Sequence, residues 1–379
     1  MPDAVIVDAV RTPLGKRNGV LADIHPADLS AHVLTQLVER TGVDPAVIDD
    51  VIWGCVSQIG EQTYDIARTA VLAAGWPHSV TGVTVDRQCG SSQQSVHFAA
   101  AGLVAGHYDA VVAGGVESMS RVPMGSSTAD QQPYPPSFQN QYGIPHQGLG
   151  AETMAERWGL SRARLDEFAL RSHARAAAAQ DEGRFSAEMA PVTTGGRMVA
   201  SDEGVRRGST LETLAGLKSP FKDDGVISAG NASQISDGAA ALLMMTTEKA
   251  TELGLRPIAR VHTVALAGDD PVLMLGAPIP ATAKALRRAG LSIGDIGAFE
   301  VNEAFAPVPL AWLAETGADE AALNPLGGAI ALGHPLGASG ARLMTTLVHH
   351  MRSNGIRYGL QTMCEAGGQA NATVIESLA

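Results

Sequence analysis

The same succession of predicted elements occurs twice in this chain of 379 residues, once in its first third and once in its last third. In the first third, apolar patterns predict strands over 4–10, 51–54, 82–85 and 110–113, and helices over 25–40 and 63–74. In the last third they predict strands over 258–264, 298–301 and 358–363, and helices over 280–289, 307–315 and 337–351. Short strands alternating with helices are typical of a parallel sheet covered on both faces. The repetition therefore predicts an α/β fold of two duplicated halves packed face to face.

The segment between the two halves, roughly 120–228, breaks this pattern. Its first part, 124–150, is rich in Gln, Pro, Ser and Gly and predicts a long excursion across the surface. The part over 151–184 is strongly helical, with a break at Gly159 and a helix start at Ser161. Long insertions on a regular scaffold commonly carry binding determinants, so we expect this segment to contribute to ligand binding.

The composition of the chain excludes some kinds of binding partner and indicates the cell compartment in which the protein works. The formal charge of -12 argues against nucleic acid or an anionic membrane as the main partner. The three cysteines, Cys55, Cys89 and Cys364, form no CxxC motif, which predicts burial or catalysis in a reducing compartment and no metal site. The apolar run at the start is too short for a secretion signal or a membrane span. We therefore expect a soluble cytoplasmic protein.

Cys89 lies where a short, buried strand predicted over 82–85 runs directly into a helix. That helix is indicated by apolar residues at one-face spacing: Val96, Ala99, Ala100, Leu103 and Val104. A thiol at a helix N-terminus meets unpaired N–H groups and the positive end of the helix dipole, which favour the thiolate. The alternative is a small buried hydrophobic residue, and this stretch alone does not separate the two interpretations.

Three further residues lie at similar turns. His334 follows a glycine-rich turn that opens a helix, at the corner of the second half equivalent to Cys89, and is a candidate base for the thiol. Cys364 leaves the last predicted strand into another glycine turn, with simple burial as the alternative. Asn302 directly follows the strand over 298–301, where it could position a water or a carbonyl, or cap the next helix. Its neighbour Glu303 could equally be a structural carboxylate.

Six motifs, in order along the chain, resemble those of the thiolase family. They are Asp86-Arg-Gln-Cys89, Gly114-Gly-Val-Glu-Ser-Met-Ser120, Ala229-Gly-Asn-Ala-Ser233, Asn302-Glu-Ala-Phe-Ala306, Gly327-Gly-Ala-Ile-Ala-Leu-Gly-His334-Pro and Cys364-Glu-Ala-Gly-Gly. The resemblance implies a five-layered αβαβα fold of two similar halves with an inserted loop domain that binds coenzyme A. The expected boundaries are 1–119 for the first half, completed by about 234–257, then 120–233 for the loop domain and 258–379 for the second half.

The resemblance also implies roles for individual residues. Cys89 would accept the acyl group of an acyl-CoA, His334 would activate it, and Cys364 would exchange the α-proton of acetyl-CoA. Asn302, with a water and His334, would form one oxyanion hole, and the backbone N–H groups of Cys89 and Ala366 the other. The positions matching coenzyme A contacts are Arg206, Thr213, Ser233 and His146.

The implied activity is an acyl-CoA:acetyl-CoA C-acyltransferase of fatty-acid metabolism, such as β-oxidation, working through an acyl-Cys89 intermediate. Acyl-CoA and CoA are then substrates, no cofactor is permanently bound, and a homodimer or homotetramer is expected. Claisen chemistry at a thioester needs a nucleophile that also leaves well, a matched base and two stabilised oxyanions. Two cysteines and one histidine meet that need.

Three positions depart from the family pattern. Ser92 stands where a glycine is common, Ala366 replaces one of three glycines, and Gln147 replaces a methionine beside the acyl pocket. Alanine keeps its N–H, so the second oxyanion hole survives if φ at Ala366 stays negative. The stretches Gly15-Lys-Arg-Asn-Gly19, Gly60-Glu-Gln62 and Ser233-Gln-Ile-Ser-Asp-Gly238 are similar to thiolases for bulkier 3-ketoacyl-CoAs, including steroid side chains.

Two other functions compete. A non-catalytic thiolase-like carrier of acyl-CoA or sterol would not need the complete catalytic set. A cysteine hydrolase with Cys89, His334 and Asn302 would release a free acid, but it leaves Cys364 and the duplicated halves unexplained.

Overall fold

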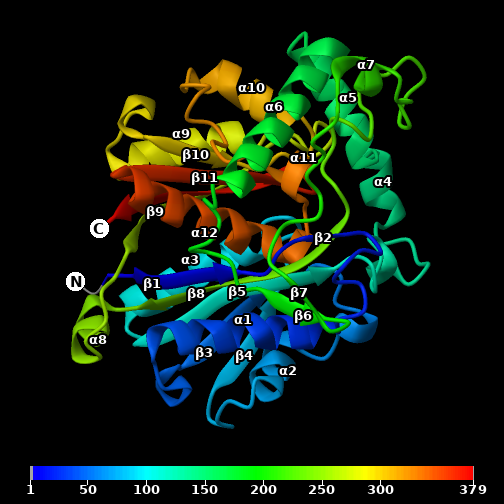
Figure 1. The fold of residues 1–379 in the computed structure, drawn as a ribbon. Coiled ribbons are helices and arrows are strands. Elements are labelled where there is room, and N and C mark those ends of the chain that lie inside the picture. The colour runs from blue at the N-terminus through cyan, green and yellow to red at the C-terminus, as the bar shows by residue number, and fades with distance from the viewer. Residues whose placement is uncertain (1–2, 379) are drawn as a thin grey trace.

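The computed structural model describes residues 3–378 and has five layers (Figure 1). Helices α9 (Pro278–Ala289) and α10 (Pro307–Thr316) cover one outer face, and helices α1 (Pro26–Thr41) and α2 (Ile66–Ala73) cover the other. Between them lie two sheet layers, separated by the central helices α3 (Ser91–Ala105) and α12 (Leu336–Asn354). The five-layered αβαβα arrangement of two halves predicted from the sequence is therefore confirmed.

The sheet of the first half has the strand order β1-β8-β5-β3-β4, and that of the second half β10-β11-β12-β9. Strands β1 and β9 pair through Val5–Arg260 and Ile6–Ala259, so the two sheets are continuous. The strand bounds are β1 Val5–Arg11, β2 Gly15–Lys16, β3 Asp50–Gly54, β4 Thr81–Val85, β5 Ala110–Ser118, β6 Val192–Thr194, β7 Arg197–Val199, β8 Ser236–Met245, β9 Ala259–Gly268, β10 Ala298–Val301, β11 Tyr358–Glu365 and β12 Gln369–Ser377.

The expectation of wholly parallel sheets was wrong. Strands β3, β4 and β5 are parallel, as are β10 and β11, but β8 and β12 pair antiparallel with both of their main neighbours. Only Ala366, Gly367 and Gly368 separate β11 from β12, and a connection that short permits only an antiparallel hairpin. Strand β4, expected to be buried, lies at the open edge and is partly exposed.

The central helices α3 and α12 lie side by side between the sheets. In α12, 15 of 19 residues are buried, because sheets or helices surround it on every side. Helix α3 buries polar residues on the side that faces β12, where Gln93 and His97 bond the Thr373 hydroxyl. Val104, predicted to be on the buried face, is 49% exposed. The helix bounds are α1 Pro26–Thr41, α2 Ile66–Ala73, α3 Ser91–Ala105, α8 Thr247–Glu252, α9 Pro278–Ala289, α10 Pro307–Thr316, α11 Ala329–Leu332 and α12 Leu336–Asn354.

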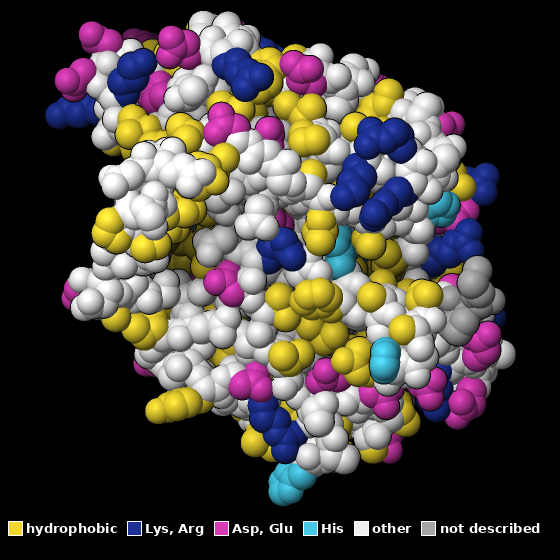
Figure 2. All heavy atoms as spheres, turned by 180° about the vertical axis from the view of Figure 1, so that it is seen from behind, with side chains coloured by type: hydrophobic (Ala, Val, Ile, Leu, Met, Phe, Trp, Pro, Cys, Tyr) yellow, Lys and Arg dark blue, Asp and Glu magenta, His cyan; other side chains and the backbone are white. Residues whose placement is uncertain are grey.

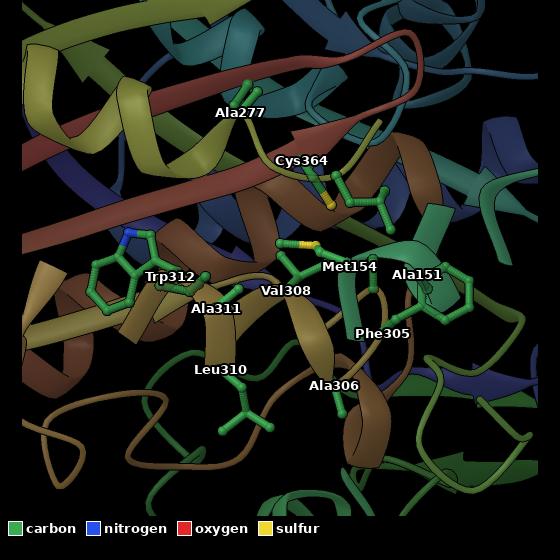
Figure 3. Packing of buried hydrophobic residues seen from close by; sticks show 14 of the residues in the cluster. Ala151, Met154, Ala277, Phe305, Ala306, Val308, Leu310, Ala311, Trp312 and Cys364 are labelled. Atoms are coloured by element: carbon green, nitrogen blue, oxygen red, sulfur yellow. The ribbon is translucent and has the colours of Figure 1, made fainter. Parts of the chain in front are cut away.

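The insertion between β5 and β8 is more ordered than its composition predicts. It forms α4 Pro136–Tyr142, α5 Gln147–Arg157, α6 Arg162–Asp181 and α7 Leu211–Ala215, as well as the hairpin β6–β7. The Ser161 side chain caps α6 by accepting from the Arg164 N–H, as expected for the predicted start. Residues of α5 pack with α10 and Cys364 in one apolar cluster (Figure 3). The insertion is thus a structural part of the second half's core.

A buried ion cluster joins the insertion to the first half. The Arg11 guanidinium of β1 pairs with Glu188 and, at 2.7 Å, with Asp202. All three side chains are shielded from solvent, so removal of one partner would leave an uncompensated buried charge. The cluster holds the stretch that continues to Arg206 against the end of β1.

Candidate active site

Cys89 lies in the tight turn between β4 and α3. Gln88 before it has φ +49°, and the Ser91 hydroxyl closes the turn by accepting from the Arg87 N–H at 2.9 Å and donating to the Gln88 carbonyl at 2.6 Å. A Cβ at Gly90 would overlap the Glu365 carboxyl, so a larger residue there would require the Glu365 side chain to shift. The corner predicted from the strand-to-helix pattern is present, with Cys89 two residues before the helix.

The expected lowering of the Cys89 pKa was wrong. Burial, followed by the charge of the nearby Glu365, raises the pKa of the Cys89 thiol to about 12. Removal from water and a neighbouring carboxyl both disfavour the thiolate, and together they outweigh the helix N-terminus. In the free protein Cys89 is therefore a neutral thiol that needs a base.

His334 occupies the corresponding corner of the second half, at the start of α12. Its Nδ1 lies 2.5 Å from the Ser339 hydroxyl, which donates its own proton to the Pro335 carbonyl at 2.8 Å. Nδ1 must then carry the hydrogen, which leaves the lone pair of the neutral ring on Nε2. Burial, and then the charge of Arg342, lower the pKa of His334 to about 3. The ring is a neutral base with its accepting nitrogen defined by Ser339.

Asn302 meets this same nitrogen. Its Nδ2 lies 3.4 Å from His334 Nε2, and its backbone N–H donates to the Thr362 carbonyl at 3.1 Å. Its Oδ1 is buried without a hydrogen-bond partner among the described residues. An unpartnered buried oxygen beside a histidine is a position that a water or a substrate group can fill.

Cys364 is only 1% exposed and points from β11 into the apolar cluster of Figure 3. Burial raises the pKa of its thiol well above the usual value, and the nearby Cys89 contributes, so the two sulfurs belong to one electrostatic neighbourhood. Ala366, at the next turn, is not among the residues with positive φ, whereas Gly367 has φ +85°. The alanine therefore keeps an unstrained N–H at that position.

Two cavities meet at Cys89. The first, of about 310 Å³, is mostly apolar and contains His334, His146 and Ser233 in its wall. The second, of about 570 Å³, reaches from Cys89 past Ala366 to the stretch around Tyr134. Met124 and Gln147 line both, and the Gln147 amide lies 3.7 Å from the Met124 sulfur. The sulfur and amide thus stand at the junction of the two spaces.

The residues predicted to contact coenzyme A are only partly brought together. His146 stacks on Phe221 with ring centroids 5.2 Å apart, and both line the smaller cavity. Arg206 lies in a neighbouring depression that also includes Ser233. Thr213 lies in none of these cavities, and its hydroxyl closes a capping box with Thr210 at the start of α7.

Three contributors to the site were not predicted from the sequence: Ser339, Glu365 and Phe221. Ser339 follows His334 by five residues, the spacing at which the first turn of a helix folds back on the residue before it. Both Glu365 oxygens are buried without a hydrogen-bond partner in residues 3–378, and burial raises the pKa of this carboxyl to about 8. No local pattern marks Phe221, which reaches the cavity only through the fold of the insertion.

Alkylation of Cys89 should report its raised pKa. We expect its rate with iodoacetamide in the free protein to rise about tenfold per pH unit between pH 7 and 9, because only the thiolate reacts and its fraction grows until the pH approaches the pKa. Peptide mass spectrometry would follow the Cys89 adduct, with Cys89→Ala as the blank. A rate that is flat over this range would mean that Cys89 is already ionised.

Family comparisons agree with this geometry. The model described as the thiolase N-terminal domain matches residues 4–248, and the thiolase C-terminal domain model matches 255–377. The chain belongs to the thiolase family. It is 51% identical to a steroid 3-ketoacyl-CoA thiolase of Mycobacterium tuberculosis, over 100% of this chain and 95% of the relative. It is 46% identical to a 3-ketoacyl-CoA thiolase of Pseudoalteromonas translucida, over 99% of each.

Solved structures extend the likeness to the fold of this thiolase. The crystal structure of a Bacillus anthracis acetyl-CoA acetyltransferase superposes with a TM-score of 0.92 and 38% sequence identity, covering 100% of this chain and 99% of that one. None of the helices among residues 3–378 combines the length and apolar character of a membrane span.

Proposed function

We propose that this thiolase cleaves 3-ketoacyl-CoA with CoA, and runs the reverse Claisen condensation, through an acyl-Cys89 intermediate. The observation that carries the proposal is the convergence of Cys89 and His334 on one cavity, with the His334 Nε2 lone pair directed by Ser339. With both groups neutral, the imidazole of His334 can accept the proton of the Cys89 thiol and so generate the nucleophilic thiolate when a substrate is bound.

In the thiolysis direction, His334 Nε2 takes the Cys89 proton, and the sulfur attacks the 3-keto carbon. The bond between the α and β carbons then breaks, its electron pair forms the enolate of acetyl-CoA, and the Cys364 thiol protonates that carbon. In the second half-reaction, the Cys364 thiolate takes the proton of the CoA thiol, the CoA sulfur displaces Cys89 from the acyl group, and the protonated His334 returns its proton to the Cys89 sulfur. Asn302 with His334, and the N–H groups of Cys89 and Ala366, would hold the oxyanions.

Substrate binding is assigned to the two spaces at Cys89. We infer that the mostly apolar 310 Å³ cavity takes the pantetheine arm of CoA, with His146, Phe221 and Ser233 in its wall. The 570 Å³ cavity would take the acyl group, and its size supports acyl groups larger than acetyl. The loop domain, 120–233, would supply the remaining contacts to CoA, which neither half provides.

The test is thiolysis of 3-ketoacyl-CoAs of increasing size, from acetoacetyl-CoA to a ring-bearing acyl group, compared by kcat/KM. We expect turnover of the larger members and an acyl adduct on Cys89 by mass spectrometry. A non-catalytic carrier would bind these compounds without turnover or adduct, and a hydrolase would release the free acid. Either outcome would contradict the proposal.

We also propose that the chain forms a homo-oligomer through the open edge of β4. This edge and the adjoining α3 expose Val83 at 43%, Phe98 at 47% and Val104 at 49%. On the face turned away in Figure 1, hydrophobic side chains lie among charged and polar ones (Figure 2). An unpaired apolar edge favours pairing with a second copy. Sedimentation should give at least twice the 39.2 kDa of one chain.

A further inference from the structure

A basic depression adjoins the smaller active-site cavity. It has a volume of about 490 Å³, and Lys16, Arg17, Glu203 and Arg206 lie in its wall. It shares Ser233, Gln234 and Ile235 with the cavity that leads to Cys89. The two spaces are therefore neighbours along one wall of the protein, the inner one mostly apolar and the outer one charged.

The net charge of the side chains around this depression is opposite in sign to the net charge of the whole chain. Three cations and one carboxylate give its wall a formal charge of +2, while the whole protein carries -12. Lys16 is paired with Glu203 at 3.2 Å. The guanidinium groups of Arg17 and Arg206 have no ion pair among residues 3–378. Two arginines without an ion pair in the wall of one hollow favour an anion as its ligand, because a guanidinium binds phosphate oxygens through several N–H groups.

The backbone of Arg17 is held in place by the other side of the depression. Its N–H donates to the Ile235 carbonyl at 3.1 Å, and β2, which ends at Lys16, pairs with the start of β8. The Glu203 carboxylate accepts from the N–H groups of Lys16 at 3.2 Å and Val20 at 3.0 Å. The loop that carries Arg17 thus comes from the first half, while Arg206 comes from the insertion.

We infer that Arg17 binds the phosphate groups at the nucleotide end of CoA, opposite Arg206. The inference rests on the proposed function and adds a residue of the first half to the binding site. A negatively charged protein repels a polyanionic substrate at long range, so a local positive field at the entrance offsets that repulsion. Because the depression and the apolar cavity share a wall, a ligand with an apolar arm and a phosphorylated end can occupy both.

The test is Arg17→Gln, measured by calorimetric titration of CoA into the protein and by the KM for CoA in thiolysis. We expect Kd and KM for CoA to rise about tenfold, the usual effect of losing one charge-assisted contact. Thiolysis of acetoacetyl-N-acetylcysteamine by N-acetylcysteamine, which carries no phosphate, should change less than about twofold. Added salt should weaken CoA binding less in the variant than in the wild type.

Arg207→Gln is the matched control, because the Arg207 guanidinium pairs with Asp181 at 2.7 Å and lies outside the depression. CoA affinity of Arg17→Gln equal to that of this control would overturn the inference. So would an equal loss with the phosphate-free pair, since Arg17 would then act on folding or catalysis. A wild type that binds CoA but cleaves no 3-ketoacyl thioester would instead contradict the proposed function, and the titration would still decide the role of Arg17.

Discussion

Cys364→Ala should still form an acyl adduct on Cys89 but should lose about 10²- to 10⁴-fold in turnover, the usual range for removing a general acid or base. Acylation from an acyl-CoA needs only Cys89 and its base, whereas carbon–carbon bond formation or cleavage needs a group that moves the α-proton. The adduct would be followed by mass spectrometry, and exchange of the acetyl-CoA α-protons by NMR in deuterated water.

Cys55→Ala is the matched control for this experiment. Cys55 is a second fully buried cysteine, directly after β3. Burial, and then the charges of Glu117 and Asp86, raise the pKa of its thiol, whereas Cys89 contributes to the raised pKa of Cys364. We expect its turnover to stay within a few fold of the wild type. Normal α-proton exchange in Cys364→Ala would remove Cys364 from its proposed role, and loss of the acyl adduct would show a wider disturbance of the site.

His334→Ala should slow acylation of Cys89 by about 10²- to 10⁴-fold, because the raised pKa of the thiol leaves almost no thiolate without a base. Ser339→Ala should cost about tenfold, since the imidazole keeps its basicity but no longer has its Nδ1 hydrogen held by the Ser339 oxygen. Single-turnover acylation, measured by quenched mass spectrometry, would give both values. His107→Ala, at an exposed histidine, is the control and should leave the rate unchanged.

The pH profile separates this role from a structural one. With a pKa lowered to about 3, His334 stays deprotonated and able to accept a proton throughout the range from pH 5 to 7. Wild-type acylation should therefore show no fall centred near pH 6.5, where an ordinary histidine protonates. A sigmoidal fall centred there and absent from His334→Ala would contradict the buried, neutral imidazole described for this site.

The corners that carry Cys89 and His334 could be predicted because they depend on local signals. Apolar runs, helix periodicity and glycine-rich turns are properties of neighbouring residues, and both corners are present in the structure. The direction of strands β8 and β12 could not be predicted, because it depends on how the chain returns to the sheet. The exposure of Val104 could not be predicted from the sequence either, since it depends on which side of α3 other elements cover.

The protonation states of Cys89 and His334 also could not be predicted from the sequence. A helix start next to Cys89 indicated a lowered pKa, but burial, and then the charge of Glu365, more than 270 residues away in the chain, raise it. The tautomer of His334 depends on its contact with Ser339, which is only five residues away in the sequence. That contact forms only because helix α12 begins between the two residues and turns Ser339 back toward the ring. Neither effect follows from residue type alone.

The sequence by itself determined the thiolase motifs, the duplicated α/β halves and the chemistry available at Cys89, His334, Cys364 and Asn302. Those features depend on residue type and short-range spacing, which act through local backbone preferences and burial patterns. Only the tertiary structure decided the raised pKa of Cys89, the two cavities that meet there, and the depression whose wall includes both Arg17 and Arg206. These depend on electric fields and surfaces made by segments far apart in the chain, which take their values only once the chain has folded.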